Sequence, residues 1–181
     1  CAVDELGLGE DHSGIMVLPE EIDGKPVSLG ADAMELLQAR DEVLEIDVTP
    51  DSGHCLSMRG IARETAQAFG LDFSDPYAAV GLEETAGGYP IRLDSPNCSL
   101  FTALTITAVD PKASTPLWIS HRLSAAGMRS ISLSVDITNY VMLESGQPLH
   151  AYDADALQGT IVVRQAHEGE HLVTLDDVDR E

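Results

Sequence analysis

The sequence predicts an α+β protein built in two parts that are joined by a linker. Apolar residues recur at helical spacing over four stretches, 31–39, 56–69, 115–126 and 136–146. Alternating or β-branched runs predict strands over 41–49, 98–109, 159–164 and 171–175. Residues 73–90 have little periodicity and are rich in turn-forming residues, so they are expected to be the linker.

Length and composition narrow the class of protein. With 181 residues, 44% of them hydrophobic, the chain can bury the core of one domain or two small ones. No apolar run reaches the roughly 18 to 20 residues of a membrane span, and no secretory signal precedes the first helix. Three cysteines without metal-ligand spacing predict reduced thiols in a cytoplasmic protein. The start at Cys1 and the end at Glu181 suggest a fragment.

The charge is strongly negative. Ten Lys and Arg residues stand against 31 Asp and Glu residues, a net charge of −21. Because nucleic-acid affinity depends largely on cations that displace counterions from phosphates, the chain is expected to bind RNA poorly by itself. Most of these carboxylates are expected to form a solvated surface.

The first part contains one well-defined helix. Residues 41–49 alternate, which predicts a half-buried strand, and residues 50–53 form a turn. Residues 56–69 are the clearest helix of the chain, and Gly70 is expected to stop it. Its buried face is predicted to consist of Met58, Ile61, Ala62, Thr65 and Phe69.

The second part begins at residues 89–94. Thr115 is expected to cap the helix 115–126, with Pro116 at its first position and Trp118 as a packing residue. Ile119, Leu123 and Ala126 are its predicted buried edge, and residues 159–164 and 171–175 are predicted to pair as a hairpin.

The stretch 129–153, RSISLSVDITNYVMLESGQPLHAYD, holds the densest set of unusual polar residues. Asp136 is placed to cap a helix that Gly146 would end. Ile137, Tyr140 and Val141 are expected to share the buried face of this helix.

The same stretch offers a candidate site. Thr138 and Asn139 would fall in the first helical turn, beside unpaired N–H donors, and the turn at 147–149 would return His150 to the helix start. This pocket would suit a carbonyl or a carboxylate. The simpler alternative is a capped helix whose His150 bonds a backbone carbonyl, and the residues alone favour it.

Three blocks resemble one family. Residues 135–153, VDITNYVMLESGQPLHAYD, closely resemble the signature of the editing domain in the beta subunit of bacterial phenylalanyl-tRNA synthetase. Residues 44–64, LEIDVTPDSGHCLSMRGIARE, and residues 109–131, VDPKASTPLWISHRLSAAGMRSI, match further blocks in the family's order. With weaker matches, the resemblance covers essentially the whole chain.

The resemblance implies a domain order. Residues 1–28 would be the tail of an inserted oligonucleotide-binding-type barrel, and residues 29–72 a small winged-helix-like domain. After the linker, residues 91–181 would be the first part of a three-layer α/β editing domain with mixed sheets.

The resemblance also implies a function. In this family the beta subunit joins a catalytic alpha subunit in an α2β2 assembly that links phenylalanine to tRNA(Phe) with ATP and Mg2+. No cofactor is implied for this fragment, and no membrane partner. The beta subunit receives the tRNA 3′ end and hydrolyses Tyr-tRNA(Phe). Tyrosine is attached by error because it differs from phenylalanine by one hydroxyl, which an apolar pocket rejects only weakly.

Site residues follow from matching positions. Thr138, Asn139 and His150 match the family's editing pocket, with Gln147 and Asp153 as second choices. His150 is expected to orient the ester or the attacking water, and whether it acts as a base stays open. A further part of that pocket lies downstream in the family, so the fragment alone is expected to be inactive.

Some positions depart from the family pattern. Asp51 and Ser52 stand where the family has Asn and Arg, and Ser cannot replace the planar donor group of Arg. In the predicted strand 98–109, uncharged residues stand where the family has basic ones. The polar contacts of those family residues are therefore not expected in this chain. Two alternatives stay open. One is a non-catalytic RNA-binding or assembly module of the same fold in a tRNA-modifying enzyme, and the other is a stand-alone hydrolase.

Overall fold

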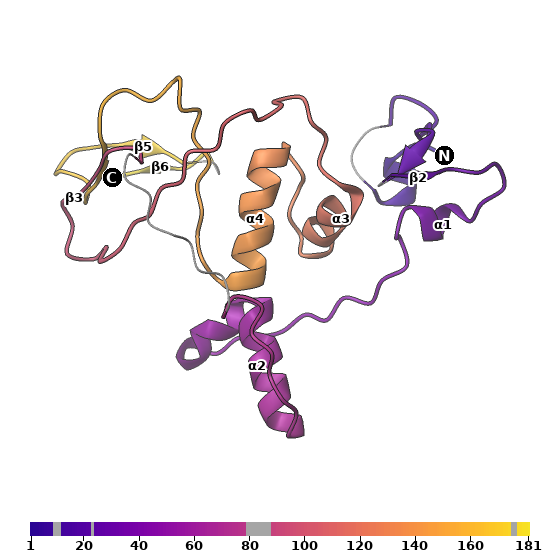
Figure 1. Cartoon of the computed structure of the whole chain (residues 1–181), viewed down its shortest axis with the longest axis horizontal. Helices are drawn as coiled ribbons and strands as arrows, with labels where there is room; N and C mark the ends of the chain where they lie inside the picture. Colours follow the sequence, from indigo (N-terminus) through magenta and orange to yellow (C-terminus); the bar gives the residue numbers. More distant parts are fainter. Residues whose placement is uncertain (9–11, 23, 79–87, 175–176) are drawn as a thin grey trace. The chain divides into compact units, whose positions relative to one another are not determined.

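A computed structural model of the chain describes residues 1–8, 12–22, 24–78, 88–174 and 177–181 (Figure 1). The chain divides into two compact units. The first comprises Cys1–Asp75 and Pro111–Ala151, and the second comprises Pro76–Asp110 and Tyr152–Glu181. This division differs from the domain boundaries expected from the sequence, which remain a prediction.

The N-terminal region of the first unit contains short elements. A 3-10 helix, η1, spans Asp4–Leu6, and two short antiparallel strands follow, β1 (Glu21–Ile22) and β2 (Lys25–Pro26). Helix α1 (Ala33–Leu36) confirms the predicted helix over a shorter range. The Asp32 carboxylate caps it by accepting from the Met34 amide at 2.9 Å.

The clearest predicted helix is confirmed as α2 (Met58–Phe69), which follows the 3-10 helix η2 (Pro50–Leu56). It ends where predicted, at Gly70, whose φ of +65° lies in the left-handed region that glycine adopts without strain. The predicted buried face is wrong in part, because Met58 is 62% exposed and Phe69 is 75% exposed. The side of α2 that packs inward carries its two buried residues, Gly60 and Ala66.

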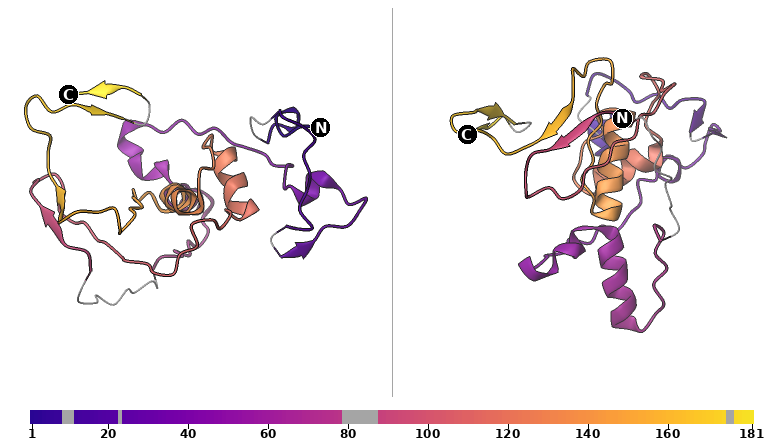
Figure 2. Two further views of the ribbon diagram at one scale, coloured as in Figure 1. Left: turned by 90° about the horizontal axis from the view of Figure 1, so that it is seen from above. Right: turned by 60° about the vertical axis from the view of Figure 1, so that its left-hand side comes forward.

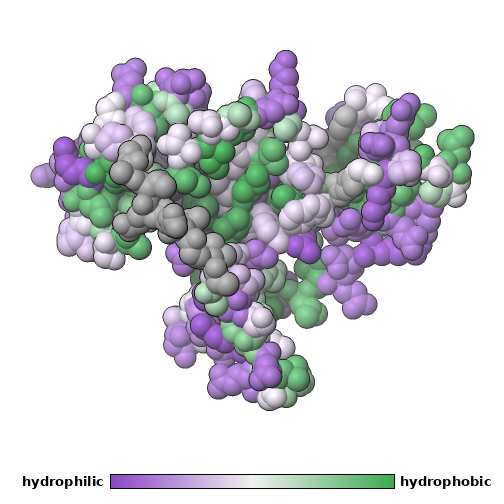
Figure 3. Space-filling model, in the orientation of Figure 1, coloured by the Kyte–Doolittle hydropathy of each residue, from purple (hydrophilic) through white to green (hydrophobic). Residues whose placement is uncertain are grey.

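Two predicted strands are absent from the described residues. Residues 41–49 and 98–109 form no strand. Their apolar side chains are exposed to solvent, for example Leu44 (83% exposed) and Leu104 (72% exposed). An alternating or β-branched pattern favours a strand only where a neighbouring strand can accept its backbone hydrogen bonds, and here none does. Figure 3 accordingly shows apolar side chains at the surface among polar ones.

Helices α3 (Leu117–Ala125) and α4 (Leu133–Ser145) complete the first unit. The predicted inward positions Ile119 and Leu123 are buried, whereas Ala126 is exposed. The predicted Thr115 cap is wrong. Pro116 occupies the cap position of α3. The Thr115 hydroxyl does not cap the helix and donates to the Asp136 carboxylate instead.

Helix α4 ends at Gly146 as predicted but begins earlier than predicted. Ser132 is its N-cap, so Asp136 lies inside the first turn and the prediction that it caps the helix is wrong. The helix starts early because the Asp136 carboxylate reaches back to the Ile131 amide, at 2.9 Å, and so supports a full turn ahead of it.

The second unit contains small sheets. Strand β3 (Ile91–Leu93) pairs in parallel with β4 (Ile161–Val163), and β5 (Leu172–Val173) pairs antiparallel with β6 (Asp179–Arg180). The predicted hairpin of 159–164 with 171–175 is therefore wrong, since each segment pairs with a different strand. The chain is thus a mixed α/β protein with small sheets.

Candidate functional site

The candidate site is built on α4 and on the segment that follows it. Gly146 turns the chain with a φ of +80°, and its amide donates to the Met142 carbonyl at 2.8 Å. Figures 1 and 2 show that the chain leaves the end of α4 without entering another helix at once. Residues 147–150 form no helix, strand or hydrogen-bonded turn, and His150 among them is exposed, so its return to the start of α4 stays a prediction.

Thr138 and Asn139 lie in the second turn of α4, so their predicted place in the first turn is wrong. Both side chains are half-buried. The unpaired amides of a helix belong to its first turn, which here precedes Thr138, because α4 starts at Leu133. The Thr138 hydroxyl donates to the Val135 carbonyl at 2.7 Å, which leaves its oxygen lone pairs available to a donor.

Asp136 anchors the start of this helix from the buried interior. Its side chain is 0% exposed. One carboxylate oxygen accepts from the Ile131 amide at 2.9 Å. The other accepts from the hydroxyls of Ser130, at 2.5 Å, and Thr115. The carboxylate therefore joins the residue that precedes α3 to the residues that precede α4.

The hydrogen bonds also set the charge of this carboxylate. Burial by itself raises the pKa of Asp136, because it penalises the ionised form. The hydroxyls of Ser130 and Thr115 and the amides of Ile131 and Ser132 lower it, and together they hold the pKa below its ordinary value. Asp136 is consequently an ionised, buried carboxylate at neutral pH.

An aromatic cluster joins the outer sides of α3 and α4. The rings of Trp118 and Tyr140 meet edge to face, with centroids 5.2 Å apart, which agrees with the predicted packing role of Trp118. The Arg122 guanidinium lies over both rings and donates to the Tyr140 hydroxyl at 2.7 Å. Tyr140 in turn donates to Glu144 at 3.0 Å. Burial, followed by Glu144, raises the pKa of Tyr140.

A groove of about 450 Å³ lies where the start of α2 meets the end of α4. Gln147, one of the predicted site residues, lines it. The described residues that line it include Arg59, Arg63 and His54 but no Asp or Glu. The sequence did not predict this groove, because nothing in it indicates that α2 lies against the end of α4.

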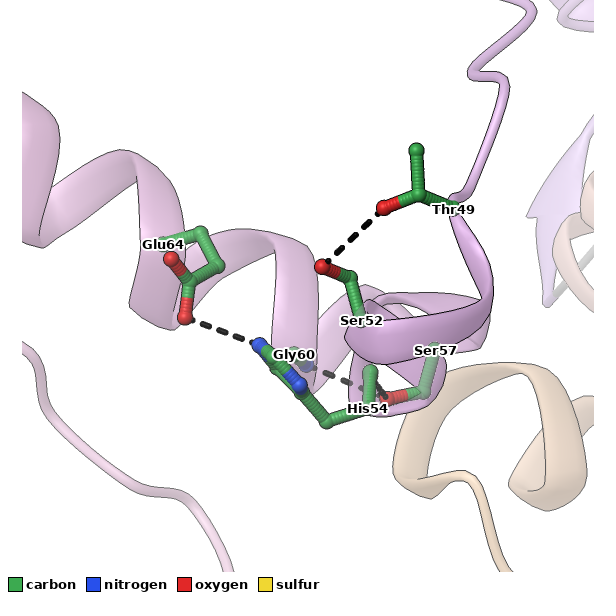
Figure 4. Close-up of polar contacts among 6 residues, drawn as sticks. All are labelled: Thr49, Ser52, His54, Ser57, Gly60 and Glu64. Carbon is green, nitrogen blue, oxygen red and sulfur yellow. Dashed lines mark hydrogen bonds and ion pairs between the residues drawn. The ribbon is translucent and has the colours of Figure 1, made fainter.

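Polar contacts fix the corner at which α2 begins (Figure 4). The Ser57 hydroxyl donates to the His54 carbonyl at 3.0 Å and accepts from the Gly60 amide at 3.1 Å. The His54 ring lies 2.8 Å from the Glu64 carboxylate, and Arg59 forms an ion pair with Asp75. Arg59 and Glu64 therefore bind α2 to the segments on either side of it.

Two features are absent from the part of the chain that the structure describes. No three His, Cys, Asp or Glu side chains gather there in a way that could hold a metal ion. No helix in this part of the chain has the length and apolar character needed to cross a membrane. All three cysteines are unpaired.

Comparison with known proteins gives one consistent answer. Residues 97–181 match the model of the B3/4 domain family. The chain is 54% identical, over 99% of its length, to the phenylalanine–tRNA ligase beta subunit of Cutibacterium acnes, of which it covers 22%. It is 56% identical to the beta subunit of Streptomyces avermitilis, over 99% of this chain and 21% of that protein.

The match extends beyond these two relatives. The beta subunit of Thermobifida fusca is 53% identical over 99% of this chain. The chain spans about a fifth of the length of the curated relatives it matches. These are subunits of an aminoacyl-tRNA synthetase, the enzyme also called phenylalanyl-tRNA synthetase, and nearly the whole chain is similar to one segment of such beta subunits.

Proposed function

We propose that the chain contributes to hydrolysis of Tyr-tRNA(Phe) as part of a phenylalanine–tRNA ligase beta subunit. The observation that carries the proposal is its 54% identity to such a subunit over 180 residues, a span that includes α4 and the segment that follows it. In this proposal the subunit works with a catalytic alpha subunit in an α2β2 assembly. ATP and Mg2+ serve the joining of phenylalanine to tRNA in the complete enzyme, not the hydrolysis.

The reaction is the hydrolysis of an ester. Water attacks the ester carbonyl that links tyrosine to the tRNA 3′ end, and tyrosine and the free tRNA hydroxyl are the products. Thr138 and Asn139 hold the aminoacyl group, with Gln147 as a further polar contact. Because the Thr138 hydroxyl donates to its own helix, its oxygen is suited to accept from the ammonium or the phenol of tyrosine.

His150 orients the ester or the attacking water in this proposal. It is exposed, on the segment that follows α4, so its ring can be reached by a large substrate. A positioned imidazole contributes roughly a hundredfold or more when it takes part in proton transfer. An orienting role that leaves the proton with water contributes less.

The net charge of −21 is compatible with this role. Phosphate contacts supply most of the affinity for nucleic acid, and an acidic surface supplies few of them. The proposal therefore assigns to this chain only the tRNA 3′ end, with the tRNA body held elsewhere in the enzyme. An RNA-binding module that acts alone would need the cations that this chain lacks.

The test uses the complete enzyme that carries this sequence in its beta subunit. His150→Ala and Asn139→Ala should each lower deacylation of Tyr-tRNA(Phe) by about tenfold or more, because each removes a contact to the reacting group. Phenylalanine activation should stay within about twofold of the wild-type rate. His121→Ala, on α3, is the matched histidine control and should change neither rate. Equal loss of both activities, or loss of neither, would reject the assignment.

A further inference from the structure

We propose that Asp136 is a positioning residue for the α4 site, fixing the first turn of the helix that carries Thr138 and Asn139. The inference rests on the proposed function, because it gives a role to a residue that lies behind the substrate-binding side chains. Asp136 itself is 0% exposed and cannot touch the substrate.

The burial of Asp136 is unusual for its chemistry. Aspartate is almost never fully buried unless it is paired, and an ionised carboxylate is costly to remove from water. The hydrogen bonds that Asp136 accepts come from neutral groups, namely the hydroxyls of Thr115 and Ser130 and the backbone amides of Ile131 and Ser132. A well-packed apolar residue would avoid the desolvation cost, so we attribute the carboxylate to the geometry that it imposes.

The contacts of Asp136 converge from two parts of the chain. Thr115 lies just before α3, and Ser130 and Ile131 lie just before α4. Because these donors all meet on one carboxylate, the first turn of α4 has little freedom to rotate or slide relative to α3. Ile119 and Leu123 are also buried on α3, but apolar burial is non-directional and does not fix the orientation of a helix as these hydrogen bonds do.

The helix carries this constraint to the proposed site. Thr138 and Asn139 follow Asp136 by two and three residues, a rise of about 3 and 4.5 Å along the helix axis. Within such a distance a helix is rigid, so any displacement of the first turn reaches both side chains. A misplacement of about 1 Å in a catalytic arrangement can lower a rate by roughly a hundredfold.

The test compares Asp136→Asn with the wild type in the complete enzyme that carries this sequence. The asparagine oxygen can still accept from Ile131, and the two hydroxyls can turn to accept from its NH2 group, so the shape is kept while the charge is lost. We expect deacylation of Tyr-tRNA(Phe) to fall about tenfold and phenylalanine activation to stay within about twofold. Hydrogen exchange should speed up in peptides that cover residues 130–140. Asp47→Asn, which changes an exposed carboxylate of the same unit, is the matched control and should alter none of these.

A second pair of variants keeps the test decisive if Asp136→Asn fails to fold. Thr115→Val keeps the size of the side chain but removes the donor, whereas Thr115→Ser keeps the donor. We expect valine to lower deacylation selectively and serine to restore it. A role in stability alone would lower phenylalanine activation and deacylation together.

Two results would overturn the inference, and they can be told apart. If Asn139→Ala lowers deacylation while Asp136→Asn and Thr115→Val leave it unchanged, or lower both activities equally, Asp136 does not position the site. If the Asn139, His150 and Asp136 variants all retain full deacylation, the proposed function itself fails, and the inference falls with it.

Discussion

Ser57 and Gly146 hold the start of α2 against the end of α4. A Cβ at Gly146 would lie 3.2 Å from the Cβ of Ser57 and 3.3 Å from its Oγ. Ser57 is the N-cap of α2, and Gly146 is the left-handed residue that ends α4. One close approach therefore links the termini of two helices and forms part of the groove that Gln147 lines.

Gly146→Ala should destabilise the chain by more than backbone strain alone. The left-handed φ of +80° costs a residue with a side chain about 1 kcal/mol, and the crowding against Ser57 adds to that cost. We expect the free energy of unfolding to fall by about 2 kcal/mol in denaturant titrations. Gly70→Ala is the control, since Gly70 also ends a helix with positive φ but has open space around it. Equal losses in the two variants would show that the Ser57 contact does not matter.

Gly60→Ala should disrupt the corner at which α2 begins. A Cβ at this position would lie 1.8 Å from the His54 carbonyl oxygen, a contact that only movement of the backbone can relieve. That movement would break the Ser57 hydrogen bonds, and we expect a loss of about 3 kcal/mol in the free energy of unfolding. The melting temperature of Gly53→Ala, where nothing lies within 4 Å, serves as reference and should hardly change.

Stability should fall on acidification, in part because of Asp136. Its pKa is lowered in the folded state, so the folded chain binds fewer protons there than the unfolded chain. The resulting stabilisation is complete above the ordinary aspartate pKa of about 4 and is lost as the pH falls through the lowered folded value. Acid unfolding monitored by circular dichroism should be less steep in Asp136→Asn and unchanged in Asp47→Asn. A wild-type slope in Asp136→Asn would contradict the lowered pKa.

Substitutions of the two charged neighbours of Tyr140 should shift its pKa in opposite directions. Burial and Glu144 raise the Tyr140 pKa, and Arg122 lowers it. Glu144→Gln should therefore bring the pKa down toward that of free tyrosine, and Arg122→Gln should raise it further. Titration of phenolate absorbance would measure both, with Tyr140→Phe identifying the signal of this residue among the four tyrosines. Shifts of the same sign in both variants would show that the charges do not act through the ring hydroxyl.

Local sequence signals predicted the helices well. Helix α2 begins and ends close to the predicted residues, because a serine cap, apolar spacing and a terminal glycine all act within a few residues of one another. The end of α4 at Gly146 follows from the same local rule. The blocks of family resemblance are also local, and the relatives that match the chain carry the name of the same family.

The start of α4 shows where local signals fail. Asp136 has the residue type of a cap and stands before an apolar run, yet Ser132 is the cap. Asp136 is drawn inside because Thr115, 21 residues earlier, supplies a hydroxyl to its carboxylate. That displacement also moved Thr138 and Asn139 out of the first turn, so the predicted place of the site on its helix was wrong by about one turn.

The sequence by itself determined which segments become helices, where two of them stop, and which family the chain resembles, because caps, apolar spacing and motif blocks are properties of neighbouring residues. Only the tertiary structure decided that Ile161–Val163 pairs in parallel with Ile91–Leu93, that residues 41–49 and 98–109 form no strand, and that Asp136 is buried. Strand pairing and burial depend on partners distant in the chain, and the residues of one segment do not specify which distant partner supplies their hydrogen bonds.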